Sequence, residues 1–479
     1  MSEVKDITVS LELQQIISSE MAWNYGIIPA EKTVDHIVFF VKADADMDFV
    51  KEDLEILTGE KIKLIPIDVL LIQKSLGKFY RRSGNLSKET ISTNSNSSNG
   101  RTGDKDDFLL RVIHEARAIG SSDIHIEIYD EDARVRIRID GHLVEKYKLE
   151  KDEYPEIVNK VKIKSNLDIT EKRLPQDGRL NFPEFDVRVS ILPTLHGEKI
   201  VLRILSRDAS QVDINNLGFA PKEMADYLEG VKKPNGIVLI SGPTGSGKTT
   251  TLYATLKVLN EEKRNIVTVE DPIEYTLKGI NQVQLKENIG LTFASALRSF
   301  LRQDPDIIML GEIRDGETAQ MAIRAALTGH LVLSTIHTNS AWGTISRLID
   351  MGVPAYLLAG TINTSVAQRL VRILCNDCKK ETDLNQHELP KDFRNKGLLK
   401  HHIPVGCDAC HFTGYKGRKA IYEVINIDHE LSDRIKDEQL KVDELLKEKE
   451  IEKINEKAFK LLTQGNTSLE EVYALLTNI

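Results

Sequence analysis

A glycine-rich loop between an apolar strand and a helix constrains the fold of this chain more than any other feature. The run GPTGSGKT at 242–249 matches G-x-x-x-x-G-K-[ST] in full, and it joins GIVLIS to KTTTLYATLKVL. A chance glycine-rich turn would not be expected to have strand, lysine, hydroxyl and helix in this order. The pattern predicts a P-loop that binds ATP with Mg²⁺.

Each residue type in this loop has a physical reason to be there. Glycines let backbone amides turn toward a triphosphate, and the helix N-terminus adds a favourable dipole. Lys248 would contact the β- and γ-phosphates, and the Thr249 hydroxyl would ligate Mg²⁺. The predicted nucleotide-binding residues are Gly242, Pro243, Thr244, Gly245, Ser246, Gly247, Lys248, Thr249 and Thr250.

Strands alternate with helices after position 235, which is typical of a parallel sheet. The expected strands are 236–241, 265–269, 306–310 and 330–335. Two of them end on an acid, Glu270 and Glu312, at the sheet edge that would face the ligand. Such a carboxylate can orient water or hold the Mg²⁺ shell, whereas the alternative is a helix cap or surface acid. Because Gly311 precedes Glu312, a water-mediated metal contact is favoured there over direct ligation.

His330 and His337 bracket the last of these strands. A lone histidine is usually structural. Two histidines at the ends of a core strand in a nucleotide domain could instead sense the γ-phosphate, and the sequence leaves both interpretations open.

All four cysteines of the chain lie between positions 375 and 410. Cys375 and Cys378 form one C-x-x-C pair, and Cys407 and Cys410 form a second pair after 28 intervening residues. Two such pairs predict a tetrahedral, closed Zn²⁺ site. Disulfides are disfavoured in a cytosolic ATP-using chain, and a redox role lacks a thioredoxin-like setting.

Composition bounds the remaining possibilities. The 479 residues suggest about three domains, and 41% hydrophobic residues allow real cores. No apolar run approaches the length of a membrane span, and the first residues lack signal-peptide character, so a cytoplasmic location is expected. The net charge of −9 argues weakly against a general nucleic-acid binder.

A polar segment divides the chain. From Ser83 to Asp104, 16 of 22 residues are Ser, Asn, Thr or Gly, which predicts a flexible linker. The unit before it should be small α/β, with strands at 35–42 and 61–66 around a helix near 48–57. After the linker, arginines alternate with apolar residues in ARVRIRI at 133–139, which predicts a strand with one basic face.

Several segments together resemble the type II secretion and type IV pilus assembly ATPases. The resemblance extends over about 107–477 and is weaker in the first 80 residues, where LTGEKIKLIPID carries it. The matching segments are GPTGSGKTT (Walker A), TVEDPIEY (Asp box), DPDIIMLGEIRD (Walker B), TGHLVLSTIHTNSA (His box), SSDIHIE, RVRIRIDG, RLPQDGRL and VRVSILPTLHGEKIVLRIL.

The resemblance implies a homohexameric ring with nucleotide between a RecA-like motor domain and the domain before it. It implies that Arg188 and Arg203 reach the phosphates from that preceding domain, with Arg179 as a third candidate. It also implies Glu270 as the water-activating base and Glu312 at the metal. By resemblance, assembly and secretion ATPases carry the tetracysteine knuckle, whereas pilus retraction motors lack it.

The expected fold is therefore multidomain α/β, a RecA-like P-loop motor preceded by a PAS-like domain and a small docking domain. The predicted parts are the docking domain 1–82, linker 83–106, PAS-like domain 107–230, ATPase core 231–370, zinc subdomain 371–425 and C-terminal helical part 426–479.

The expected function is a cytoplasmic ATPase that powers pilus or pseudopilus assembly through an inner-membrane platform protein. A docking protein would bind residues 1–82, membrane association would be peripheral, and no stable nucleic-acid partner is expected. The alternatives are a nucleic-acid-translocating or conjugation-type motor and a nucleotide-binding scaffold without turnover.

Overall fold

The computed structural model covers the whole chain and separates into two compact units, one of residues 1–107 with 146–150 and the other of residues 108–145 with 151–479. It describes residues 13, 16–17, 19–33, 36–43, 45, 47–58, 60–69, 71–72, 75–76, 106–206, 213–394 and 396–477. The predicted linker at 83–106 lies outside the described residues, apart from its last position.

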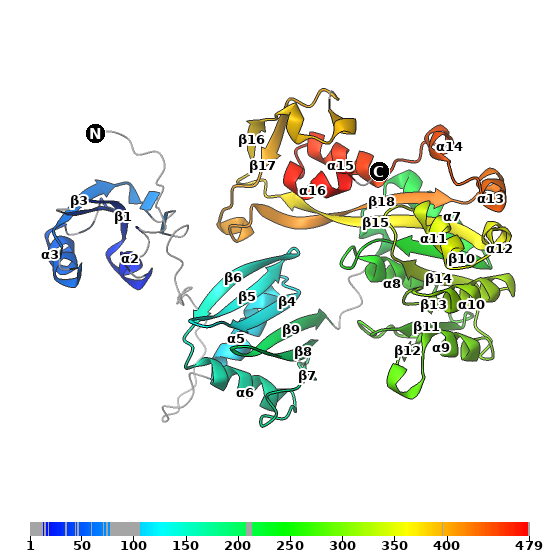
Figure 1. Ribbon diagram of the computed structural model, residues 1–479, viewed down its shortest axis with the longest axis horizontal. Coiled ribbons are helices and arrows are strands. Elements are labelled where there is room, and N and C mark those ends of the chain that lie inside the picture. The colour runs from blue at the N-terminus through cyan, green and yellow to red at the C-terminus, as the bar shows by residue number, and fades with distance from the viewer. Residues whose placement is uncertain are drawn as a thin grey trace. The chain divides into compact units, whose positions relative to one another are not determined.

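The N-terminal unit is a small α/β fold built on a three-stranded sheet (Figure 1). Its elements are α2 (Ser19–Tyr25), β1 (Ile27–Lys32), β2 (Ile37–Lys42), α3 (Met47–Thr58) and β3 (Ile62–Ile67). The two predicted strands and the helix between them are confirmed as β2, β3 and α3, and β1 adds an antiparallel edge. Ile28, Phe39 and Leu54 are fully buried in its core.

A six-stranded sheet follows, in the order β6-β5-β4-β9-β8-β7. The predicted basic strand is β5, in which Val135 and Ile137 are buried and the three intervening arginines are partly exposed. The elements are α5 (Asp106–Ala118), β4 (Asp123–Ile128), β5 (Ala133–Ile139), β6 (His142–Leu149), α6 (Tyr154–Lys164), β7 (Gln176–Asn181), β8 (Phe185–Thr194) and β9 (Gly197–Ser206).

A seven-stranded sheet carries the glycine-rich loop, in the order β12-β11-β13-β14-β10-β15-β18. All neighbours are parallel except β15 and β18. Its elements are α7 (Pro221–Lys232), β10 (Gly236–Ser241), α8 (Lys248–Leu259), β11 (Ile266–Glu270), β12 (Asn281–Gln284), α9 (Phe293–Phe300), β13 (Ile307–Leu310), α10 (Gly316–Leu327), β14 (Leu331–Ile336), α11 (Gly343–Asp350), α12 (Ala355–Thr361), β15 (Ile362–Leu374) and β18 (Tyr415–Asn426).

This sheet confirms the predicted alternation of strands and helices. Every residue of β10 and β14 is buried, because apolar layers cover both faces of the sheet. A buried parallel sheet aligns the carboxyl ends of its strands, so the loops after β10, β11, β13 and β14 share one edge.

The C-terminal region adds a two-stranded hairpin, β16 (Lys380–Asp383) with β17 (Lys400–Ile403), between β15 and β18. The predicted C-terminal helices are α13 (His429–Lys436), α14 (Asp443–Glu448), α15 (Ile454–Thr463) and α16 (Leu469–Thr477). The single-turn helices are η2 (Ile214–Asn216), η3 (Glu287–Ile289), η4 (Gln386–Glu388), η5 (Lys391–Phe393) and η6 (Asp408–Cys410). Within the described ranges, no helix is both long and apolar enough to span a bilayer.

Candidate functional site

The glycine-rich loop adopts a backbone that its glycines permit. Gly245 and Gly247 have φ of 81° and 88°, in the left-handed region that side chains disfavour. A Cβ atom at Gly242 would lie 2.5 Å from the Gln368 carbonyl oxygen, so the backbone can pass there only without a side chain. The loop then opens α8 at Lys248, as the motif predicts.

The side chains of this loop range from buried to exposed. Thr249 and Thr250 are exposed, and Lys248 donates to the carbonyls of Gly242 (2.8 Å) and Pro243 (3.0 Å). Burial lowers the pKa of Lys248. The Ser246 hydroxyl is buried and lacks a hydrogen-bond partner among the described residues. These groups are the ones that the motif assigns to phosphate and Mg²⁺.

Two residues of β15 hold the segments around the site, and the sequence did not single them out: Gln368 contacts the loop and Arg369 the segment after β14. Gln368 donates to the Ser246 carbonyl (2.9 Å) and accepts from the Thr251 hydroxyl (2.9 Å). Arg369 is buried and donates to the carbonyl of Asn339 (2.9 Å), beyond the end of β14. The local pattern gives no signal for these contacts, because they depend on β15 pairing with β10.

Glu270 lies at the end of β11 and is 3% exposed. Its carboxylate accepts hydrogen bonds from the hydroxyl of Tyr253, the hydroxyl of Thr268 (2.6 Å) and the amide of Gln282 (3.1 Å). A carboxylate has about four acceptor positions, so three donors leave room for a water. Tyr253 and Gln282 are further residues that the sequence analysis missed.

Glu312 lies on the same edge of the sheet, two residues beyond β13. It is paired with Arg314, and its Oε2 lies 3.3 Å from His337 Nε2. Arg314 is also 3.6 Å from Asp271, which follows Glu270. The structure therefore brings Glu312 and His337 together beside the predicted phosphate site.

The prediction for His330 needs correction. His330 precedes β14, and the register places Leu331 opposite Gly236 at the start of β10. Its ring nitrogen Nδ1 lies 2.8 Å from the Ala325 carbonyl at the end of α10. The six residues of β14 separate it from His337 by about 20 Å. The two ends of a strand lie at opposite edges of the sheet, so His330 lies at the edge opposite the P-loop, and we interpret it as a structural residue.

The predicted arginines form a row on the six-stranded sheet. Arg179, Arg188 and Arg203 are direct cross-strand neighbours on β7, β8 and β9, and Asp123 continues the row on β4. Arg203 Nε donates to Asp123 Oδ1 (2.8 Å), while its side chain stays 57% exposed. Arg188 donates to the carbonyl of Ile273 and lies 3.8 Å from Glu274.

All three arginines line a cleft of about 710 Å³. Pro272 and Gln284, from the segments after β11 and in β12, line the same cleft. A volume of this size is within the usual range for small-molecule sites. The cleft thus joins the arginine row to the segment that follows Glu270.

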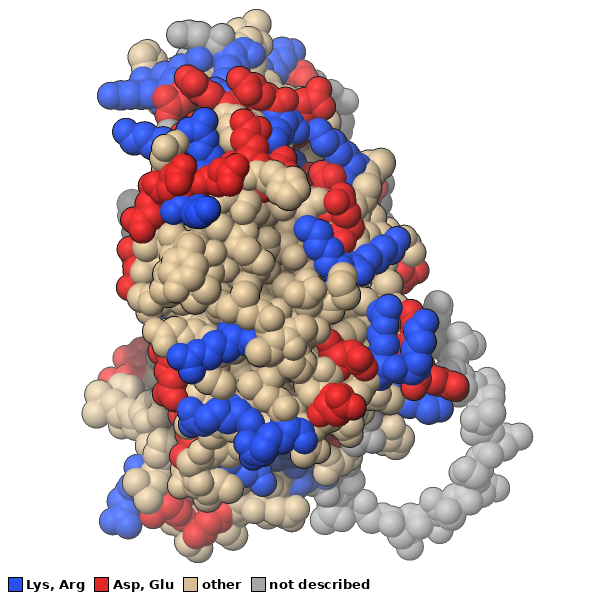
Figure 2. Space-filling model, turned by 90° about the vertical axis from the view of Figure 1, so that its right-hand side faces the viewer, with Lys and Arg blue, Asp and Glu red and all other residues tan. Residues whose placement is uncertain are grey.

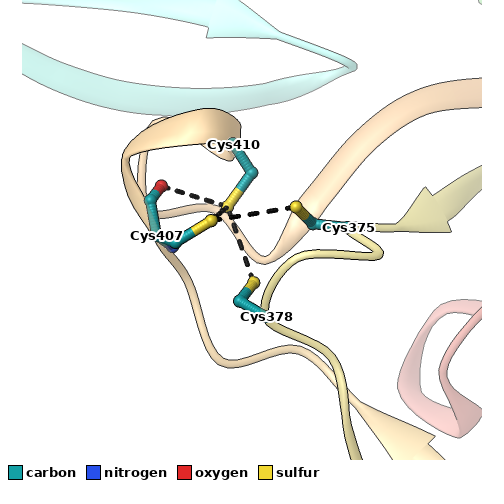
Figure 3. A group of neighbouring side chains, drawn as sticks. All are labelled: Cys375, Cys378, Cys407 and Cys410. Carbon is teal, nitrogen blue, oxygen red and sulfur yellow. Dashed lines mark hydrogen bonds between the residues drawn. The ribbon is translucent and has the colours of Figure 1, made fainter.

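The four cysteines converge on one point, with their sulfurs directed toward one another (Figure 3). Neighbouring Sγ atoms are 3.7–3.9 Å apart. Four thiolates at about 2.3 Å from a tetrahedral Zn²⁺ are separated by about 3.8 Å, so the observed spacing fits zinc and is far too long for a disulfide. Backbone amides of Gly406, Cys407 and Gly414 donate to the sulfurs at 3.2–3.3 Å, which would stabilise thiolate charge.

Comparisons with known proteins agree on one family. Residues 102–474 match the family model described as type II/IV secretion system protein. The type IV pilus assembly ATPase PilB of Myxococcus xanthus is 40% identical over 456 residues, 88% of this chain and 79% of that protein. The type II secretion system ATPase E of Vibrio cholerae is 44% identical over 375 residues, 76% of this chain and 74% of that protein.

Solved structures of two ATPases share the fold of this chain. The pilus retraction motor PilT with bound ADP has a TM-score of 0.53 and 27% identity, over 76% of this chain and 96% of that one. The ATPase DotB of Legionella pneumophila has a TM-score of 0.59 at 22% identity, over 80% of this chain and 98% of that one, and shares the fold. The resemblance identified from the sequence motifs and the α/β fold class are both confirmed.

Proposed function

Because the chain belongs to the type II/IV secretion system protein family, we propose that it is the ATPase that powers assembly of a pilus or secretion pseudopilus. Its enzymatic activity is ATP hydrolysis. One observation carries the proposal: the family match includes a complete P-loop whose sheet edge also carries Glu270 and Glu312.

In the proposed reaction, Lys248 and the loop amides would hold the triphosphate, and the Thr249 hydroxyl would hold Mg²⁺, which when bound would supply charge neutralisation. A water molecule attacks the γ-phosphorus and transfers its proton to the Glu270 carboxylate. The bond from the water oxygen to phosphorus forms as the bond to the ADP oxygen breaks. Glu312 and His337, whose side chains are 3.3 Å apart, would help to orient water near the Mg²⁺ site.

We assign Arg188 and Arg203 to the transferring phosphoryl group. A guanidinium at that position stabilises developing charge and can be worth roughly 10³–10⁵ in rate. The exposed end of Arg203 beside the cleft supports this role. Since both arginines belong to the six-stranded sheet, phosphate contact would couple nucleotide state to movement of that sheet.

The remaining parts of the proposal concern assembly. The chain would work as a homohexamer on the cytoplasmic side of the inner membrane, bound to a platform protein. The N-terminal unit would dock a partner. The cysteine cluster supports a structural Zn²⁺ and, through the family resemblance, an assembly rather than a retraction motor.

The second candidate function is a nucleic-acid-translocating motor with the same RecA-like fold. Such a motor needs a continuous basic surface. Figure 2 instead shows basic and acidic residues interleaved on the face it presents, with an uncharged region between them. On that face the charges do not form such a surface.

The test is a steady-state ATPase assay on the full chain. Lys248→Ala and Glu270→Gln should each lower Mg²⁺-dependent turnover at least about a hundredfold. The exposed Lys263→Ala, in the turn after helix α8, is the matched control. Parental turnover in both Lys248→Ala and Glu270→Gln would rule out ATP hydrolysis at this site. Strong activation by DNA at low salt, with none by the platform protein, would favour the nucleic-acid motor.

A further inference from the structure

The P-loop helix carries a tyrosine that reaches the proposed base. Tyr253 lies on α8, five residues after Lys248, and it is fully buried. Its hydroxyl donates to Glu270 Oε2 and accepts from the backbone N–H of Glu274 (3.3 Å). One hydroxyl therefore joins the P-loop helix, the proposed base and the segment after β11.

This contact is built into the core. The Tyr253 ring packs edge-on against Tyr275, with ring centroids 4.6 Å apart at 85°. Burial, followed by the charge and hydrogen bond of Glu270, raises the pKa of Tyr253, so the hydroxyl keeps its proton and acts as a donor. A buried ring has few rotamers available, and the Glu270 oxygen that it bonds is held in one direction.

Thr268 and Gln282 both donate to the other carboxylate oxygen, Oε1. Among the described residues, the hydrogen bond to Oε2 thus comes from Tyr253. Without it, the carboxylate would keep its burial and two of its donors, but rotation about its terminal bond would be less restricted. We propose that Tyr253 is a positioning residue that fixes the direction of the Glu270 carboxylate toward the attacking water, an inference that rests on the proposed function.

Tyr275 supplies a matched control. Its hydroxyl is buried and has no hydrogen-bond partner among the described residues, and burial raises its pKa to about 12. Tyr253→Phe and Tyr275→Phe each remove one buried hydroxyl from the same ring pair. Only the first removes a hydrogen bond to Glu270.

The experiment measures kcat and KM for ATP in the full chain, together with the melting temperature. Tyr253→Phe should lower kcat about tenfold, because a small misplacement of the base weakens only the transition state, while KM changes less than about twofold. Tyr275→Phe should change both constants less than about twofold.

A double-mutant cycle separates positioning from general stability. In the Glu270→Gln background, adding Tyr253→Phe should change kcat less than about twofold, because the group that it positions is gone. An equal loss of kcat in both backgrounds, or parental kcat in Tyr253→Phe, would overturn the proposal. If Glu270→Gln itself keeps parental turnover, the assignment of the base fails instead, and the two failures are distinguishable.

Discussion

The sheet that carries the arginine row is stabilised by a buried acid with three cationic neighbours. Glu127 on β4 is 3% exposed and accepts two hydrogen bonds from Arg136, at 2.7 and 2.9 Å. Lys199 Nζ lies 2.9 Å away, and Arg134 Nε lies 3.3 Å away. Burial alone would raise the pKa of Glu127, but bonds and charges from Arg136 and Lys199 outweigh it and lower the pKa from 4.5 to about 2.

The lowered pKa of Glu127 gives the size of the stability loss expected when its charge is removed. At about 1.4 kcal/mol per pKa unit, a fall from 4.5 to about 2 corresponds to about 3 kcal/mol of folding stability at pH 7. Glu127→Gln keeps the size of the side chain and removes its charge. The variant should therefore lose up to about 3 kcal/mol, with the three cations left to repel one another.

Native-state hydrogen–deuterium exchange measures this loss locally. Peptides from β4, β5 and β9 should show a lower free energy of opening in Glu127→Gln, while peptides from the seven-stranded sheet stay unchanged. Asp177→Asn on β7, the edge strand of the same sheet, is the control, because Asp177 is an exposed acid whose change should cost less than about 0.5 kcal/mol.

The pH dependence gives a second check. A carboxylate with a lowered pKa contributes stability that is fully present above its unfolded pKa and is lost as pH falls through its folded pKa. The difference between parent and Glu127→Gln should therefore be constant above about pH 5 and shrink toward pH 2. Equal protection of the two proteins at pH 7 would refute the reasoning.

Three further predictions concern the other sites. Metal analysis should find about one zinc per chain, and Cys375→Ser should lower both the zinc content and the melting temperature; full stability without zinc would reject a structural site. Arg188→Ala and Arg203→Ala should each reduce kcat at least about tenfold while changing ATP affinity less, as measured by turnover and nucleotide titration; parental turnover in both would remove their proposed role. His330→Gln should keep kcat within about twofold of the parent, and a large loss would contradict its structural assignment.

Local patterns predicted the features that depend on neighbouring residues. The P-loop, the strands around it and the two cysteine pairs are encoded within short windows, because each needs only a fixed spacing of residue types. The alternation in β5 is likewise a property of a single strand. These features agree with the structure for that reason.

Contacts between distant segments could not be predicted in this way. Gln368 reaches Ser246 only because β15 pairs with β10, and Gln282 reaches Glu270 only because β12 pairs with β11. The position of His330 is different, since the direction of a parallel strand already implies that its two ends lie at opposite edges of the sheet. His330 precedes β14 and His337 follows it, so only His337 lies at the edge of the P-loop.

Strand β15 connects the glycine-rich loop to the cluster of four cysteines. Gln368 braces the loop, and Leu374, about 20 Å farther along the strand, immediately precedes Cys375. Side chains alternate along β15 from Gln368 to Arg372, before its register with β18 shifts between Arg372 and Leu374. Inserting one residue between Gln368 and Arg372 would therefore turn the side chains that follow it to the opposite face. A chimera that exchanges the cysteine subdomain with a relative must therefore preserve the number of residues from Gln368 to Cys375. Otherwise the side chains at the two ends of this segment no longer point in the directions that the loop and the cysteine cluster require.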